Sequence, residues 1–155
     1  MGLFDFFRAP APYRDPTLGQ LLYSGGRWRG SMELEPGKTV VLFLPGARSG
    51  PLPDALQVAR QAPASWRRLR PEVEKELFEH YSNGRDGGAV DLPEIATSDD
   101  IWSHVTLSSV EIRPYESVDE FQVAIRTAWD DEHTLGAIAR DATLVGLNGS
   151  ILEPR

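Results

Sequence analysis

The sequence predicts an α+β domain in which two antiparallel β-meanders flank a central block of two helices that pack on one face of the sheet. Strand-like runs joined by short turns occupy residues 17–44 and again residues 104–149. Helical spacing of apolar residues is confined to residues 54–84, between the two meanders. Helices that are segregated from the strands are typical of α+β folds, whereas parallel α/β folds alternate the two.

The domain organisation follows from the length and from the proline content of the N-terminus. The 155 residues are the size of one ordinary domain. We expect residues 1–16 to be a lead-in segment and residues 17–155 to be a single domain. Prolines in residues 9–16 predict little regular structure there. The apolar residues of MGLFDFF are expected to form a short turn packed on the domain, with a membrane or partner contact as the alternative.

The first meander is predicted from alternation and turn residues. Gly25-Gly26 suits a two-residue hairpin turn, and Pro36-Gly37 suits a type II turn. Trp28 and Leu34 fall on one strand face if Gly30 is a position of close approach. The last run, TVVLFL, is continuously apolar, which favours a central strand. The three expected strands are residues 17–24, 27–34 and 39–44.

Two helices are predicted between the meanders, over residues 54–62 and 65–84, because Pro63 breaks the pattern. Asp54 and Ser65 are the expected N-caps, and Asn83-Gly84 is the expected end. Five apolar residues of the second helix share one stripe that faces the sheet: Trp66, Leu69, Val73, Leu77 and Tyr81.

The second meander begins after a capped helical turn at residues 98–102. Its first strand changes phase at Ser108-Ser109, which predicts a β-bulge. The next run alternates cleanly, with Phe121, Val123 and Ile125 on one face. The expected strands are residues 104–115, 119–129, 134–140 and 143–149.

Charge and cysteine content exclude several classes of function. The net charge is −7, and residues 83–155 contribute −9 with five basic and 14 acidic side chains. Such a surface repels phosphate, so we expect no nucleic-acid binding and instead favour docking to a basic protein partner. The absence of cysteine excludes disulfides and thiolate metal sites. No apolar run is long enough to span a membrane.

One cluster has residue types that carry chemistry: Asp130, Asp131, Glu132 and His133, directly after Trp129. Adjacent side chains on a strand point to opposite faces, so four in a row converge only if the chain curls. We therefore interpret the cluster as a hairpin turn whose aspartate caps backbone N–H groups. A metal or acid–base site that recruits His80 or His104, and a partner-binding loop, remain as alternatives.

A second candidate is the triplet Arg27, Trp28 and Arg29, which has the composition to stack a base or bind a phosphate. Exposed strand residues are the simpler interpretation. We expect His80, as a cation, to interact favourably with the C-terminal end of its helix. We expect His104 to have a structural role. We predict no metal and no cofactor, because no phosphate-binding loop, nucleophile elbow or zinc motif is present.

Four segments resemble a domain-of-unknown-function family of small uncharacterised bacterial proteins: DPTLGQLLYSGGRWRGSMEL, ELFEHY, LPEIATSDDIWSHVTLSSVEI and TAWDDEHTLGAIARDATLVGLNGSI. The most specific part is a C-terminal hairpin motif of the form WDxEHxLG…NGSI. Ala142 stands where such proteins often have glycine. The resemblance implies a single α+β domain in a bacterial cytoplasm, and it implies no activity.

The sequence does not reveal a specific biochemical function. It favours a non-enzymatic protein-interaction module, for which an immunity-type inhibitor is an analogy, with Trp28, Trp102 and Trp129 as interface anchors. One alternative is a hydrolase or metal-dependent enzyme that uses the hairpin cluster. Another is a small-ligand binder that uses the sheet face opposite the helices. The oligomeric state is not predicted.

Overall fold

Eight strands form one sheet in the order β1-β2-β3-β4-β7-β8-β9-β10. The structure, a computed structural model, describes residues 9–114 and 119–154. All neighbouring strands are antiparallel except β4 and β7, which are parallel and join the two meanders. The strands are β1 (Tyr13–Asp15), β2 (Gly19–Ser24), β3 (Arg27–Glu35), β4 (Lys38–Leu44), β7 (Val105–Ile112), β8 (Glu120–Thr127), β9 (Asp130–Arg140) and β10 (Thr143–Asn148), and β5 (Gly46–Ala47) and β6 (Gly50–Pro51) form a separate small hairpin.

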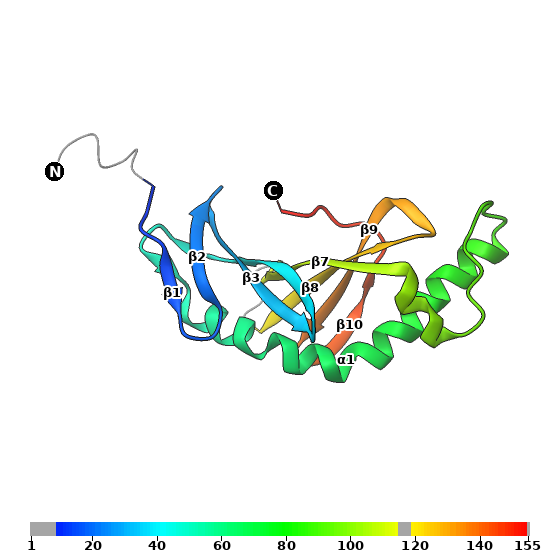
Figure 1. Ribbon diagram of the computed structural model, residues 1–155, viewed down its shortest axis with the longest axis horizontal. Coiled ribbons are helices and arrows are strands. Elements are labelled where there is room, and N and C mark those ends of the chain that lie inside the picture. Colours follow the sequence, from blue (N-terminus) through cyan, green and yellow to red (C-terminus); the bar gives the residue numbers. More distant parts are fainter. Residues whose placement is uncertain (1–8, 115–118, 155) are drawn as a thin grey trace.

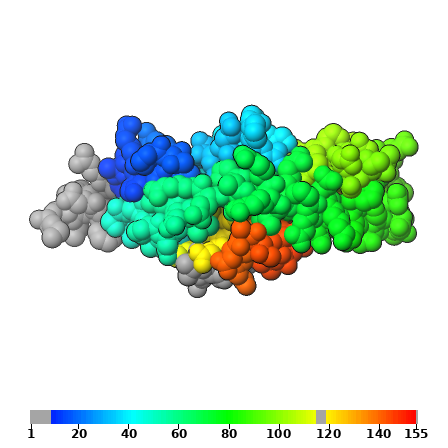
Figure 2. All heavy atoms as spheres, turned by 90° about the horizontal axis from the view of Figure 1, so that it is seen from below, coloured from blue at the N-terminus to red at the C-terminus, as the bar shows by residue number. Residues whose placement is uncertain are grey.

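The helical block between the meanders contains the long helix α1 (Pro53–Asp86) and the short 3₁₀ helix η2 (Ser98–His104). Helix α1 lies along one face of the sheet (Figures 1 and 2). The expected α+β class and the paired meanders are confirmed, as is the capped turn now seen as η2. The order of the elements thus places all helical cover on one face.

The break expected at Pro63 is absent, because α1 runs unbroken through both Pro63 and Pro71. An internal proline costs a helix about 3 kcal/mol. Here the residues on both sides of Pro63 are buried, including Ala59, Ala62 and Trp66. Packing against the sheet outweighs the lost hydrogen bond, and the helix axis bends instead of breaking (Figure 1).

The ends of α1 also differ from expectation. Leu52 occupies the N-cap position and makes no side-chain cap, while Asp54 lies in the first turn and accepts a hydrogen bond from the Ala55 N–H. Ser65 is a buried residue within the helix, not a cap. The helix continues past Asn83-Gly84 to Asp86, and Gly87 follows as the C-cap.

The predicted helix stripe is the centre of the core. All five of its residues are buried against the inner face of the sheet. Trp66 also donates a 2.8 Å hydrogen bond to Glu35, in the β3–β4 hairpin. Burial raises the pKa of the Glu35 carboxyl, but bonds from Trp66, Lys38 and Arg70 outweigh it and hold the pKa below its usual value. This carboxylate therefore ties the first meander to α1.

Several local predictions about strands are confirmed. The register of β7 shifts between Leu107 and Ser109, as a bulge requires. Gly25 and Gly26 both have positive φ in the β2–β3 turn. A Cβ at Gly30 would lie 2.4 Å from the Leu21 side chain, so Gly30 is a position of close approach. Trp28 and Leu34 are buried together on the helix-facing side.

The N-terminal part of the chain shows one difference. Residues 13–15 form β1, which pairs with β2, although the proline-rich lead-in predicted little regular structure. The side chain of Asp15 in β1 is buried and bonds the N–H groups of Thr17 and Leu18, each at 2.9 Å. The apolar MGLFDFF segment lies outside the described residues. In the part of the chain that the structure describes, no helix is both long and apolar enough to cross a membrane.

Candidate interaction site

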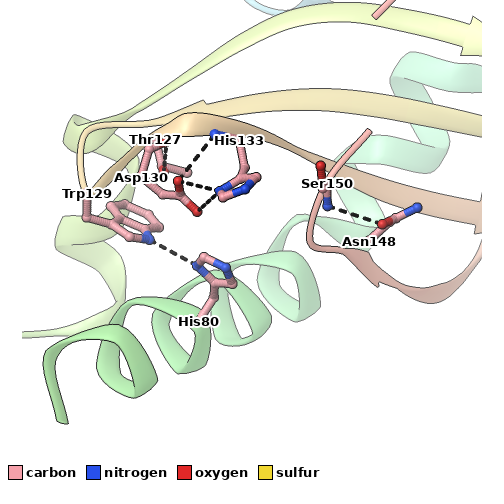
Figure 3. Close-up of polar contacts among 7 residues, drawn as sticks. All are labelled: His80, Thr127, Trp129, Asp130, His133, Asn148 and Ser150. Carbon is pink, nitrogen blue, oxygen red and sulfur yellow. Dashed lines mark hydrogen bonds and ion pairs between the residues drawn. The ribbon is translucent and has the colours of Figure 1, made fainter. Parts of the chain in front are cut away.

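The acidic cluster lies at the tip of the β8–β9 hairpin (Figure 3). Ala128 and Trp129 form the two-residue turn, because Thr127 pairs with Asp130 across it. The register then shifts: Arg126 pairs with Thr134, so Asp131, Glu132 and His133 are extra residues on β9. The chain does curl here, but through a bulge directly after the turn.

Asp130 closes this bulge. Its carboxylate accepts a 3.2 Å hydrogen bond from the His133 N–H, and it lies 2.8 Å from His133 Nδ1. Asp131 and Glu132 are exposed and make no ion pair within residues 9–114 and 119–154. Asp130 thus caps the backbone, and the other two carboxylates remain exposed to solvent.

The two remaining histidines do not complete a site with this cluster. His80 contacts Trp129, and His104 contributes its backbone carbonyl, which accepts a 2.9 Å bond from the Ala128 N–H. Across the described residues, no group of three or more histidine, aspartate or glutamate side chains has the arrangement of a metal site. The convergence that a hydrolase or metal enzyme would need at this hairpin is therefore not seen in the described residues.

Trp129 anchors the hairpin to α1. Its indole N–H donates a 3.1 Å hydrogen bond to His80 Nδ1 (Figure 3). Its ring also packs edge-on against Tyr81, with the ring centroids 5.7 Å apart. The expected position of His80 at the end of the helix is wrong, because α1 continues six residues further, to Asp86, and Arg85 is the basic residue of its last turn.

The triplet of β3 is divided between the two faces of the sheet. Trp28 is 1% exposed and belongs to the core, where its indole N–H donates to the Ala47 carbonyl at 2.9 Å. Its ring packs edge-on against Tyr13 and Tyr23. Burial leaves this side chain no surface on which to anchor a partner.

Arg27 and Arg29 lie on the opposite face, over the ring of Phe43 at 5.9 and 5.8 Å from its centroid. Arg27 also pairs with Glu111 of β7 at 3.2 Å. Burial raises the pKa of the Glu111 carboxyl, and the charge of Arg27 opposes that rise. The two arginines therefore belong to a surface that spans the junction of the meanders, and Phe43 lies beneath them.

That surface is the sheet face opposite α1, and residues 149–154 cross part of it (Figure 1). The Ile151 N–H bonds the Thr134 carbonyl at 2.8 Å, and a Cβ at Gly136 would lie 2.7 Å from the Ile151 side chain. A groove of about 520 Å³ lies between this segment and the sheet. Its polar lining includes Arg27, Glu111 and Gln122.

Sequence reasoning missed the residues of this groove that come from outside β3. Glu111 had a weak signal, since it alternates with Val110 and Ile112 along a predicted strand. Glu153 had none, because its partners Ser108 and Arg126 lie 45 and 27 residues away. The placement of the C-terminal segment depends on tertiary contacts, which the local sequence pattern does not indicate.

Comparison with known proteins identifies the family. The model of a domain of unknown function, DUF6985, matches residues 17–150. The chain belongs to the DUF6985 family. Among curated proteins and among solved structures, no match is found for this DUF6985 chain. The match confirms that the chain belongs to a family of unknown function, as the resemblance predicted, and the function has to be argued from the surface.

Proposed function

We propose that this DUF6985 domain is a non-enzymatic protein-interaction module that docks a basic partner through the acidic hairpin of residues 129–133. The observation that carries the proposal is the exposure of Asp131 and Glu132 on a turn that is fixed to α1. Trp129 bonds His80 and packs on Tyr81, so the carboxylates are held on a rigid support. A preorganised charged surface loses less conformational entropy on binding than a mobile one.

The electrostatic surroundings support a basic partner. Residues 83–155 carry the whole acidic excess of the chain. Asp99 and Asp100 are exposed in η2, whose last residue bonds the hairpin turn. Complementary charge speeds encounter and selects partners more than it adds affinity. The hairpin therefore suits a specific docking contact that weakens as the salt concentration rises.

Two narrower statements belong to this proposal. The module acts in a bacterial cytoplasm, which the family resemblance supports and cell fractionation would check. An immunity-type inhibitor, which binds and blocks a basic toxin, is one form of such a module and rests on analogy with other small acidic bacterial proteins. In that form, the partner recovered from native cells is a toxin domain with a basic surface.

A charge-reversal experiment tests the proposal. Asp131→Lys with Glu132→Lys reverses the hairpin charge, and Glu33→Lys with Asp119→Lys makes the same change of net charge at exposed positions elsewhere. The wild type and the second variant, purified from native cells after cross-linking, should retain one stoichiometric basic partner that the hairpin variant loses. Recovery of no such partner, or equal recovery by both variants, rules the proposal out.

The groove beside the C-terminal segment favours a second candidate function, the binding of a small polar ligand. About 520 Å³ is room for a small molecule, and Arg27, Glu111 and Gln122 supply polar groups of opposite character. A thermal-shift screen of small zwitterionic compounds should find one that stabilises the wild type but not Arg27→Gln. Equal shifts for both proteins would exclude this groove.

A further inference from the structure

The sheet face opposite α1 already holds one segment of this chain, residues 149–154, which carries a single carboxylate. Glu153 is the anchor of that segment. Its carboxylate accepts a 2.9 Å bond from Arg126 Nε, a 2.9 Å bond from Ser108 Oγ and a 3.4 Å contact from Thr134 Oγ1. One guanidinium and two hydroxyls from β7, β8 and β9 therefore form a carboxylate site on the second meander.

The first meander has the same kinds of side chain, one arginine and two hydroxyl residues, on the same face of the sheet. A shallow hollow of about 470 Å³ is lined by Arg29, Ser24 and Ser31, together with Gln20, Leu22 and Gly30. Cross-strand pairing puts Leu22 beside Arg29 and Arg29 beside Phe43. Here too one guanidinium and two hydroxyls lie together, but no carboxylate among the described residues pairs with Arg29.

The carboxylate site around Glu153 and the hollow at Arg29 belong to one continuous surface. A single row of cross-strand partners runs from Leu22 through Arg29, Phe43 and Glu111 to Gln122. Residues 149–154 cross β9, β8 and β7 on that surface and head toward the first meander (Figure 1). An extended peptide laid on the first meander would continue the same path.

We propose that the Arg29 hollow binds an extended acidic segment of a partner protein, with a glutamate or aspartate side chain on Arg29 and an apolar side chain on Leu22. The carboxylate takes the place that Glu153 has on the second meander. Charge supports this polarity, because residues 1–50 carry a net charge of +2 in an otherwise acidic chain. The exposure of Leu22, at 51%, supplies the apolar contact that a free inorganic anion does not use.

Arg29 is well prepared for such a contact. Its guanidinium lies over the Phe43 ring, which restricts its motion while the charged edge stays in solvent. A preordered arginine loses less side-chain freedom when it binds a carboxylate. The site does not involve the hairpin of residues 129–133, so either proposal can fail without the other.

Amide NMR titrations with a matched pair of peptides test the inference. The probes are acetyl-GLEGLEG-amide and its glutamine analogue, acetyl-GLQGLQG-amide. The glutamate peptide should shift the amides of Leu22, Arg29 and Ser31, and the glutamine peptide should bind about tenfold more weakly or worse, as loss of one charge-assisted hydrogen bond predicts. Arg29→Gln should cause a similar loss, while Arg68→Gln, an equal charge change on exposed α1, should cause none.

Each other outcome overturns the proposal. Equal binding of the two peptides, or full binding to Arg29→Gln, removes the carboxylate contact. Sodium acetate that reproduces the same shifts at the same concentration of carboxylate shows a small-anion site only. Shifts that grow with protein concentration in the absence of peptide show that a second copy occupies the face. If Arg29→Gln does not fold, the difference in affinity between the two peptides for the wild type still tests the carboxylate contact.

Discussion

The two meanders have the same topology but differ in what covers their outer face. Residues 149–154 lie over the second meander, and Glu153 holds them there through Arg126 and Ser108. The first meander keeps Leu22 and Arg29 in solvent and is tied to α1 from the other side, through Asp15 and Glu35. Equal strand arrangements therefore become a covered face in one half and an open face in the other.

The burial of β8 differs from that of the first-meander strands in the same sense. Six consecutive residues of that strand, 120–125, are buried on both sides of the sheet. In the first meander, β2 and β3 bury only the residues that face α1, such as Leu21, Trp28 and Met32. The covered half is a three-layer structure, and the open half has two layers and a free surface.

The largest effect on the free energy of unfolding is expected from a substitution that displaces the C-terminal segment from the second meander. Gly136→Val places a branched side chain where Ile151 and Gln122 already lie within 2.7 Å of a Cβ. Overpacking of this kind costs about 3 kcal/mol. Urea unfolding should show the loss, and hydrogen exchange should show a faster Ile151 amide. Gly149→Val is the control, since nothing lies within 4 Å of a Cβ there; equal losses for the two variants would contradict the packing argument.

The next effect concerns the tie between the first meander and α1. The hydrogen bond from Arg60 to the Asp15 carboxylate lowers the pKa of Asp15 to about 2. Burial opposes this shift, and the N–H groups of Leu18 and Thr17 add to it. The unfolded value is about 3.9. The ionised carboxylate therefore stabilises the fold at neutral pH, and this contribution disappears as the pH falls from about 4 toward 2.

Asp15→Asn should accordingly lower the free energy of unfolding by about 2 kcal/mol at pH 7, because a buried charge-assisted bond to Arg60 is lost. The deficit should shrink as the pH falls from about 4 toward 2, because in this window Asp15 takes up a proton in the unfolded wild type before it does so in the folded protein. Denaturant unfolding followed by tryptophan fluorescence at both pH values measures it. Asp119→Asn, at an exposed position, should show neither effect. A deficit independent of pH would assign Asp15 a purely steric role.

A smaller effect should follow from loosening the covered face without adding bulk. Glu153→Gln removes the charge that Arg126 pairs with but keeps the shape of the side chain. A partly exposed ion pair contributes up to about 1 kcal/mol. Exchange of the Ile151 amide should accelerate and approach the solvent rate before exchange of the β9 amides changes. Unchanged exchange would mean that Ile151, and not the carboxylate, holds the segment; Glu132→Gln, in the exposed hairpin, is the matched control.

Local patterns predicted the parts of the fold that depend on local physics. The five-residue stripe of α1, the bulge before Ser109 and the glycine turn at residues 25–26 each follow from periodicity or from backbone freedom. The predicted break at Pro63 was wrong because packing of the helix on the sheet outweighs the local cost of the proline. The sequence shows the proline but not that packing. In the same way, alternation placed Trp28 on the face of Leu34, and the burial of that face removed Trp28 from the binding surface.

The candidate site was predictable only in part, for a related reason. Asp130 as a capping residue follows from turn chemistry, and the structure shows its bond to the His133 N–H. The Trp129–His80 bond, which fixes the hairpin, joins residues 49 positions apart and has no local signature. The pairing of Arg27 with Glu111 spans 84 positions and depends on the parallel contact between β4 and β7.

The smallest expected effect on stability comes from a comparison of two turns of similar backbone conformation, one in each meander. Gly25-Gly26 and Asp141-Ala142 both connect paired strands with two residues of positive φ, at 59° and 84° in one and at 50° and 58° in the other. Residues with a Cβ lose about 1–2 kcal/mol in this left-handed region, whereas glycine does not. The second meander therefore carries strain at Ala142 that the first avoids.

Ala142→Gly should relieve that strain and stabilise the domain by about 0.5–1 kcal/mol, after allowance for the greater freedom of glycine in the unfolded chain. A rise of about 2–3 °C in the melting temperature is the expected size for a chain of this length. Gly26→Ala is the reciprocal change in the first meander and should lower stability by a similar amount, since nothing within 4 Å obstructs a Cβ there. If both substitutions destabilise, the turn at residues 141–142 gains more from the alanine methyl group than backbone conformation alone predicts, and the equivalence of the two turns fails.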